Sequence, residues 1–338
     1  MNFKFNVTKT TTTEGGSKKE VDWDKLHEHI ISAAGTEKKA RSIPGVISGI
    51  YDLGEQNRGD AEIDVDDAEF RKKFPEYDGS DSSKKLIASK RNGSYFKDEA
   101  GKTFYCYPQK AVQQVAIAVD FPQILVDKGQ FFGKSNKLPL RMLLNGEFSI
   151  NKERIVGKPF SIVEKKYDDG VWAFAKNNGL HKLADAADIL DERGYFTKDR
   201  IGELLGKVAL FKMRVWMKPA KTGDKKFFTE EISLSGPIPE GVNVPEYDES
   251  ILHGVNLYGE NDEESVKQLR LCVKNTIKKA NNYEGSDIQK LLVKLESGNG
   301  NSSATSSPKP AVSNMVVKQE KEVEQEVEEE DFDENSPF

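Results

Sequence analysis

Cationic and aromatic side chains alternate along residues 209–219, at positions where they could grip a nucleic-acid strand. In the stretch LFKMRVWMK every second residue is apolar, and three cations and a tryptophan stand between them. The apolar set is Phe211, Met213, Val215 and Met217, and the other set is Lys212, Arg214, Trp216 and Lys218. Rings that stack on bases and cations that neutralise the backbone are what sequence-independent single-strand binding requires. This alternation therefore predicts a strand with a core face and a strand-binding face.

Residues 225–235 supply the second strand of the predicted hairpin, after a turn over residues 219–224. The predicted pairs are Lys218 with Lys225, Trp216 with Phe227, Arg214 with Thr229, and Lys212 with Glu231. Two rings then stand in a cationic frame, where each stacked base contributes about 1–3 kcal/mol. Two alternatives stay open: the rings form a cross-strand pair beneath a helix, or a one-residue slip exchanges the faces.

A second set of rings and cations lies in a Gly-bounded loop, residues 127–141. Its members are Phe131, Phe132, Lys134, Lys137 and Arg141. We interpret the loop as a wall of the same groove, and the alternative is a basic loop over an apolar anchor. Tyr95, Tyr105 and Tyr107 form a third set, although a ring with a polar tip in a hairpin is more often half-buried structure.

The C-terminal residues 315–338 form a strongly acidic tail. They carry ten acids and two lysines, a net charge of −8, while the whole chain has −6, so residues 1–314 sum to +2. The tail ends DFDENSPF. Phe338 suits an apolar pocket on a partner, with its carboxylate beside a cation at the pocket mouth. The alternative is an acidic tail that nothing binds.

This ending resembles the acidic tip of bacterial single-stranded DNA-binding proteins, Asp-Phe-Asp-acid-acid-Ile-Pro-Phe. The register matches at Asp331, Phe332, Asp333, Pro337 and Phe338. Glu334 keeps the charge, whereas Asn335 and Ser336 replace an acid and the isoleucine. Phage-encoded members of this class are more similar, since they combine enlarged oligonucleotide-binding (OB) bodies with acidic, Phe-ended tails.

The resemblance implies protection of single-stranded DNA in replication, recombination and repair, in the cytoplasm of the host cell. It also implies that the tip recruits a polymerase, a helicase or primase, or a nuclease. The fold class expected is α+β, with a β-rich OB-like barrel, peripheral helices and a disordered acidic tail. Four segments are expected: a flexible start (1–20), the OB-like DNA-binding body with insertions (21–296), a Gly/Ser/Pro-rich linker (297–314) and the partner-binding tail (315–338).

Hydrophobic spacing predicts the elements that would position these residues. Helices are predicted over residues 21–35, 180–194, 197–207, 262–282 and 286–296. Strands are predicted over 42–54, over 94–108 (a hairpin), over 111–122 and over 138–150 (one strand or a pair). In the third of these, Val115, Ile117, Val119 and Phe121 share one side. Residues 55–93 are polar and indicate a surface insertion with one short helix near residues 68–74.

Other chemistry finds little support in the sequence. No stretch approaches 18 consecutive apolar residues, and two cysteines without a ligand pattern favour a reduced, intracellular setting. Three residues lie between the glycines of GQFFGKS (129–135), whereas a phosphate loop needs four. We therefore expect a non-enzymatic protein without metal or cofactor. The rivals are a tip mimic that engages replication proteins without binding DNA, and a nuclease or recombinase that holds Mg²⁺ in acidic clusters.

Overall fold

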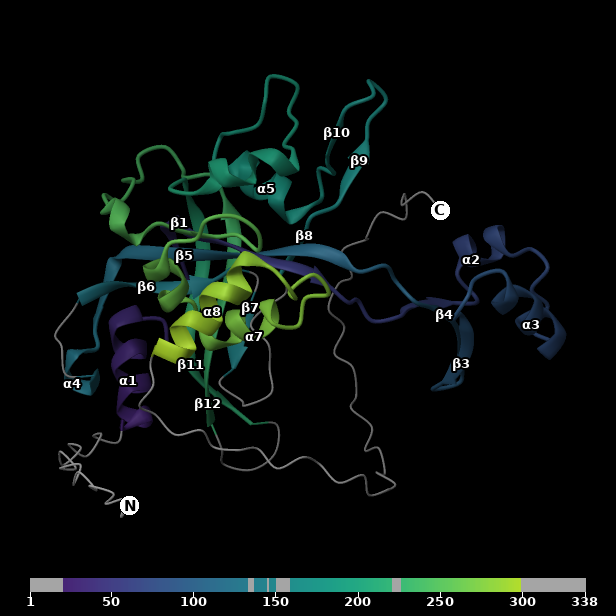
Figure 1. Ribbon diagram of the computed structural model, residues 1–338, viewed down its shortest axis with the longest axis horizontal. Coiled ribbons are helices and arrows are strands. Elements are labelled where there is room, and N and C mark those ends of the chain that lie inside the picture. The colour runs from purple at the N-terminus through teal and green to yellow at the C-terminus, as the bar shows by residue number, and fades with distance from the viewer. Residues whose placement is uncertain (1–20, 133–136, 145, 150–158, 221–225, 299–338) are drawn as a thin grey trace, which may run out of the picture.

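The computed structural model describes residues 21–132, 137–144, 146–149, 159–220 and 226–298 (Figure 1). Helices and strands are mixed, and the body is rich in sheet. No helix in these ranges is long and apolar enough to cross a membrane.

One large sheet organises the body, with strand order β6-β5-β1-β11-β12-β7. These strands are β1 (Arg41–Gln56), β5 (Val112–Asp127), β6 (Lys137–Leu143), β7 (Gly146–Ser149), β11 (Val208–Pro219) and β12 (Lys226–Gly236). Every neighbouring pair on this path is antiparallel. Two short strands join it: β8 (Phe160–Ser161) on β5, and β13 (His253–Val255) parallel to β1.

The two outermost strands of this sheet, β6 and β7, are consecutive in the chain. Only Leu144 and Asn145 separate them, so the two edges approach within about 11 Å where the chain passes from one to the other. Arg270 also links β6 to β12, the neighbour of β7, because its guanidinium bonds Glu230 of β12 at 2.5 Å and the carbonyl of Arg141 on β6. The sheet is therefore strongly curled. Its ladders form no closed barrel among the strands that the structure describes.

The main core lies against one face of the sheet. Val115, Ile117, Val119 and Phe121 of β5 all point into it, as the alternation predicted. Helices α1 (Trp23–Ala34) and α5 (Gly179–Ala186) cover this core. The opposite face packs a smaller core against α6 (Glu263–Gln268), α7 (Leu271–Ile277) and α8 (Asp287–Gly298), which lie in front of the sheet in Figure 1.

Local signals explain where α1 begins and ends. The carboxylate of Asp22 accepts a hydrogen bond from the backbone N–H of Lys25 at 3.1 Å, which satisfies a free donor at the helix start. Gly35 ends the helix in a left-handed conformation with φ of 62°, which glycine adopts without a Cβ penalty. The predicted helix over residues 21–35 is thus confirmed.

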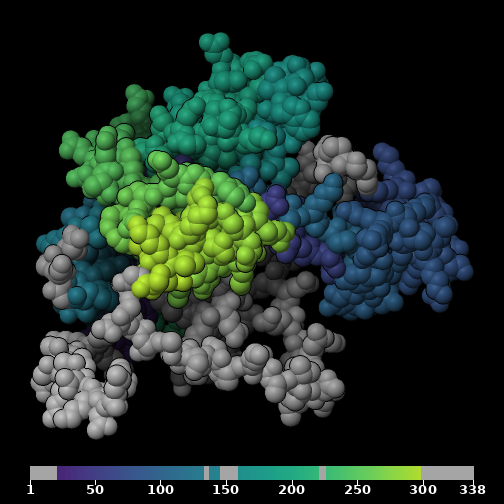
Figure 2. All heavy atoms as spheres, viewed as in Figure 1, coloured from purple at the N-terminus to yellow at the C-terminus, as the bar shows by residue number. Residues whose placement is uncertain are grey.

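Residues 57–111 form a projecting subdomain between β1 and β5 (Figures 1 and 2). It contains β2 (Ala61–Asp64), α2 (Ala68–Lys73), α3 (Asp81–Ser89), β3 (Tyr95–Glu99) and β4 (Lys102–Tyr107), with sheet order β2-β4-β3. Its own core consists of Val65, Phe70, Phe74, Tyr77, Ile87 and Tyr105. The short helix and the 94–108 hairpin were predicted, whereas β2 and α3 were not.

Several predicted helices are shorter or broken. Residues 262–282 form two helices, because Leu269 and Arg270 adopt extended backbone between α6 and α7. Helix α5 ends at Ala186, shortly before Asp188 with φ of 55°. The helix predicted at 197–207 is a 3₁₀ helix, η1 (Lys198–Leu204). The remaining elements are α4 (Gly129–Phe132), β9 (Glu164–Lys166), β10 (Trp172–Phe174) and η2 (Glu249–Ile251).

Candidate nucleic-acid interface

The β11–β12 hairpin has the two faces that its alternation predicts. Phe211, Met213 and Val215 are fully buried in the main core. On the other side, Lys212 and Lys218 are exposed and Arg214 and Trp216 are half-buried. We call this side the hairpin face and include the half-buried Phe227 and the exposed Glu231 and Ser233 of β12. These exposed residues show that the face reaches solvent at Lys212, Lys218, Glu231 and Ser233. Thr229, opposite Trp216, is in contrast fully buried.

The pairing register within the hairpin differs from the prediction by two residues. Lys218 pairs with Phe227, Trp216 with Thr229, Arg214 with Glu231, and Lys212 with Ser233. A shift of two residues keeps every side chain on its predicted face. Both registers set one cation of β11 opposite Glu231, but the predicted register was wrong in also setting Lys218 opposite Lys225, where like charges repel. Trp216 and Phe227 are consequently diagonal neighbours, not a direct cross-strand pair.

Arg214 organises the centre of the hairpin face. Its guanidinium carbon lies 4.4 Å from the centre of the Trp216 ring. One Nη of the same group donates to the carbonyl of Glu37 at 2.9 Å. The cation thus shields one side of the indole and fixes its position. Both a guanidinium plane and an indole are surfaces on which a base can stack.

A run of cations that sequence reasoning missed lies beside this face. Lys38 and Lys39 are both exposed. The hydrogen bond from Arg214 to the carbonyl of Glu37 keeps these residues alongside β11. The register of β1 on β11, in contrast, sets the exposed Arg41 opposite the buried Met213 and therefore on the core side of the sheet. The signal in the sequence was the run EKKAR just before the first strand, but its neighbour in the sheet could not be read from the chain.

The second predicted set is dispersed in the structure. Phe131 packs against the main core, with its ring centre 5.8 Å from that of His29. Lys137 is exposed at the start of β6 and pairs with Asp127 on β5. Lys134 of this set and Lys225 of the hairpin lie outside the described residues. The geometry does not join this loop to the hairpin face.

Arg141 has a structural environment. Its guanidinium bonds both carboxylate oxygens of the buried Asp120, at 2.8 and 2.9 Å, and the carbonyl of Ile251 at 2.8 Å. Burial works against the charged form, yet the adjacent Asp120 carboxylate raises the pKa of Arg141 above its ordinary value. Since its donors are held by protein acceptors, Arg141 serves the fold and is no part of the strand path that we propose.

The three tyrosines of the third set belong to the subdomain. Tyr105 is buried in its core, Tyr107 is half-buried, and Tyr95 is 45% exposed. The phenol of Tyr95 lies 3.1 Å from a carboxylate oxygen of Asp60, and this hydrogen bond, followed by burial, raises its pKa. These rings mainly build the subdomain, which agrees with the expectation that tyrosines in a hairpin are more often half-buried structural residues.

A Ser/His/Asp grouping exists that the sequence did not show. The hydroxyl of Ser265 donates to Asp262 at 3.0 Å and lies 3.3 Å from Nδ1 of His253. Ser265 and His253 are both only 5% exposed. Because the hydroxyl donates to the carboxylate and is buried, the arrangement stabilises the start of α6 and offers no accessible nucleophile. No group of three or more potential metal ligands occurs within the described ranges.

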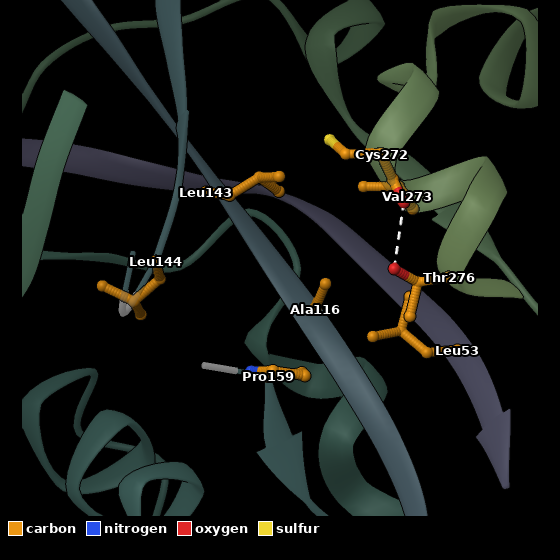
Figure 3. A pocket seen from close by; sticks show the side chains of 8 residues that line it. All are labelled: Leu53, Ala116, Leu143, Leu144, Pro159, Cys272, Val273 and Thr276. Carbon is orange, nitrogen blue, oxygen red and sulfur yellow. Dashed lines mark hydrogen bonds between the residues drawn. The ribbon is translucent and has the colours of Figure 1, made fainter. Parts of the chain in front are cut away.

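A pocket of about 350 Å³, partly open to solvent, lies between β5 and α7 (Figure 3). Its lining is Leu53, Ala116, Leu143, Leu144, Pro159, Cys272, Val273 and Thr276. The Thr276 hydroxyl already donates to the carbonyl of Cys272 at 2.9 Å, and burial raises the pKa of the Cys272 thiol. The pocket therefore presents neither cations nor convergent polar groups to a nucleic acid.

The predicted partner-binding residues Asp331, Phe332, Asp333, Pro337 and Phe338 lie outside the described part of the chain. No protein-family description, curated protein or solved structure matches this chain.

Proposed function

We propose that this protein binds single-stranded DNA on the hairpin face and protects it during replication, recombination and repair. Bases stack on Trp216 and Phe227, and the cations of the hairpin together with Lys38 and Lys39 neutralise the backbone. The observation that carries this proposal is the hairpin face itself, a solvent-open surface with two rings and cations from two chain segments. No catalytic step is part of this function.

We also propose that the curled sheet is an OB-like barrel. In chain order its strands are β1, β5, the split strand β6–β7, β11 and β12, and the split strand neighbours β5 at one end and β12 at the other. A five-stranded, partly open barrel of Greek-key type is the OB architecture. Helix α5 follows the third strand and packs on the main core. In OB folds the loop between strands four and five contacts oligonucleotides, and here that loop is the tip of the β11–β12 hairpin.

The acidic tip completes the proposed function. We propose that Phe338 and Pro337 dock on replication proteins such as a polymerase, a helicase or primase, or a nuclease. The support is the sequence match at Asp331, Phe332, Asp333, Pro337 and Phe338. A tip of this kind would bring the partner to DNA that the body already covers.

A comparison of Trp216→Ala with Trp172→Ala tests the DNA-binding proposal. Trp172 is a matched control, because it is 51% exposed on the β9–β10 hairpin, away from β11. Loss of one stacking ring weakens single-strand binding by about 1–3 kcal/mol, and Trp172→Ala should bind like the wild type. The measurement is a salt-titrated binding assay with single- and double-stranded oligonucleotides of the same sequence.

Two outcomes would contradict the proposal. Equal affinity of the wild type for single-stranded and double-stranded DNA would refute a preference for single strands. An equal loss of affinity in both variants would show that the hairpin face is not the binding site. A protein that captures replication proteins through its tip and shows no DNA affinity would instead be the tip mimic.

A further inference from the structure

Cations gather where the ends of two subdomain helices meet. The last turn of α2 contributes three, and two follow α3. We call this group the helix-end cluster: Arg71, Lys72, Lys73, Lys90 and Arg91. The side-chain nitrogens of Lys73 and Lys90 each lie 5.8 Å from the ring centre of Phe74, so the two helix ends share one surface.

Acids and cations are separated within the subdomain. Residues 57–111 hold as many acids as cations, but acids occupy the starts of α2 and α3 and cations their ends. In the helix-end cluster, Arg71 pairs with Asp66 at 2.8 Å and Lys90 pairs with Glu76. A helix dipole favours a cation in its last turn, yet adjacent like charges repel. The excess of positive charge on this surface suits a polyanion.

The aromatic rings beneath the helix-end cluster are closed to bases. Phe74 and Tyr77 are only 7% and 8% exposed, and the guanidinium carbon of Arg71 lies 4.9 Å from the centre of the Tyr77 ring. The guanidinium carbon of Arg91 lies 4.0 Å from the ring centre of the half-buried Tyr107 and shields one side of that ring, so a ligand at this surface would meet mainly cations. Such a surface recognises phosphate groups and is indifferent to whether the bases are paired.

We propose that the helix-end cluster binds the phosphate backbone of the DNA whose unpaired bases occupy the hairpin face. This inference rests on the proposed function. The body then selects single strands through its rings, whereas the subdomain binds the phosphate backbone of single-stranded and double-stranded DNA alike. The ligand that suits both surfaces at once is a single strand of DNA that continues into a duplex.

The experiment compares two double variants that each remove two cations from the subdomain. Lys72→Ala with Lys90→Ala alters the helix-end cluster. Lys97→Ala with Lys102→Ala is the matched control, because these lysines lie on β3 and β4 and, like Lys90, form ion pairs, with Glu62 at 3.3 Å and Asp64 at 3.0 Å on β2. Each double variant changes the net charge equally, so any general charge effect is the same in both.

The measured quantity is the slope of log affinity against log salt, on a long single-stranded oligonucleotide and on the same oligonucleotide with a duplex end. Each phosphate of a single strand that the protein no longer neutralises lowers the slope by about 0.7. The cluster variant should therefore show a slope smaller by about 0.7 to 1.4, because Lys90 also pairs with Glu76. The control pair should keep the wild-type slope. Equal slopes in all three proteins, or equal reductions in both variants, would overturn the proposal.

Tryptophan fluorescence separates failure of this inference from failure of the proposed function. Trp23, Trp172 and Trp216 all lie outside the subdomain, so their quenching reports only binding to the body. A wild type without quenching or single-strand preference refutes the proposed function. Quenching together with an unchanged slope in the cluster variant refutes only the inference. Thermal melting confirms folding, and Lys72→Glu at its exposed site repeats the test if the double variant unfolds.

Discussion

Arg214 prepares the hairpin face before any strand arrives. Its bond to the carbonyl of Glu37 fixes the guanidinium, and the guanidinium in turn fixes the Trp216 ring at 4.4 Å. Ordering a rotamer-rich side chain on binding costs about 0.5–1.5 kcal/mol. A ring that is already held avoids much of this cost, so its stacking contributes more fully to affinity.

His27 makes the stability of the fold depend on pH. Its imidazole stacks on Phe228 with ring centres 4.5 Å apart, and neither ring nitrogen has a hydrogen-bond partner among the described residues. Burial lowers the pKa of His27 below 6.5, although the negative charges of Asp24 and Glu230 act in the opposite direction. The unfolded chain therefore takes up a proton near pH 6.5 that the native state resists.

The native state should accordingly lose stability as the pH falls below about 6.5. His27→Phe keeps the stacked ring and removes the titration, so its stability should fall less steeply, by at most about 1.4 kcal/mol per pH unit. Urea unfolding between about pH 7 and pH 5 measures this slope. Trp23→Phe, a neighbour without a titrating group, should follow the wild type. An unchanged slope in His27→Phe would show that His27 stays neutral in both states or titrates equally in both.

The residue scale also shows what the sequence could and could not predict at the site. The period of two in LFKMRVWMK was enough to assign both faces, because only one face can be buried. The register depended on the number of turn residues and on cross-strand charges, which alternation does not encode. Lys38 and Lys39 were missed because their neighbour, β11, lies far away in the chain.

At the scale of elements, the subdomain is separable from the body. Its core shares no residue with the two cores of the body. Gln56, at the end of β1, and Val112, at the start of β5, are direct cross-strand partners. These two strands could therefore be joined by a tight hairpin turn alone.

Replacing residues 57–111 by Asn-Gly, which favours a two-residue hairpin turn, should leave a folded body. The expected result is a single cooperative thermal transition, with tryptophan quenching by short oligonucleotides as in the wild type. As a contrast, deletion of residues 179–186 removes the fully buried Leu180 and Leu183 from the main core and should abolish folding. A collapsed or aggregated 57–111 replacement would mean that the subdomain supports the body.

Helices and strands were predicted correctly where a local signal sets their ends. They were predicted wrongly where contacts with distant parts of the chain set them. Asp22 and Gly35 bound α1 by capping alone. The helix predicted at 262–282 breaks because Arg270 must reach Glu230 and the edge of β6. The placement of β6 and β7 at opposite ends of the sheet order could not be predicted, since adjacent strands usually pair with each other.

At the scale of the whole molecule, charge is divided between body and tail. Residues 1–314 have a net charge of +2, and the last 24 residues have a net charge of −8. A tethered polyanion and a DNA strand would compete for the same cations, and this competition weakens as salt screens it over about 10 Å at 0.1 M. Under the proposed function, local cationic surfaces and not the total charge would attract DNA to this protein.

Deletion of residues 315–338 should tighten single-strand binding at low salt, and the difference from the wild type should shrink as salt rises. Phe338→Ala separates the two proposed roles of the tail, because it keeps every side-chain charge and removes the terminal ring. This variant should bind DNA like the wild type and lose association with replication proteins in a pull-down. If the truncated chain binds DNA no more tightly at low salt, the tail does not reach the hairpin face. If Phe338→Ala keeps every association, the terminal ring is not the anchor, and the acids alone must account for any partner binding.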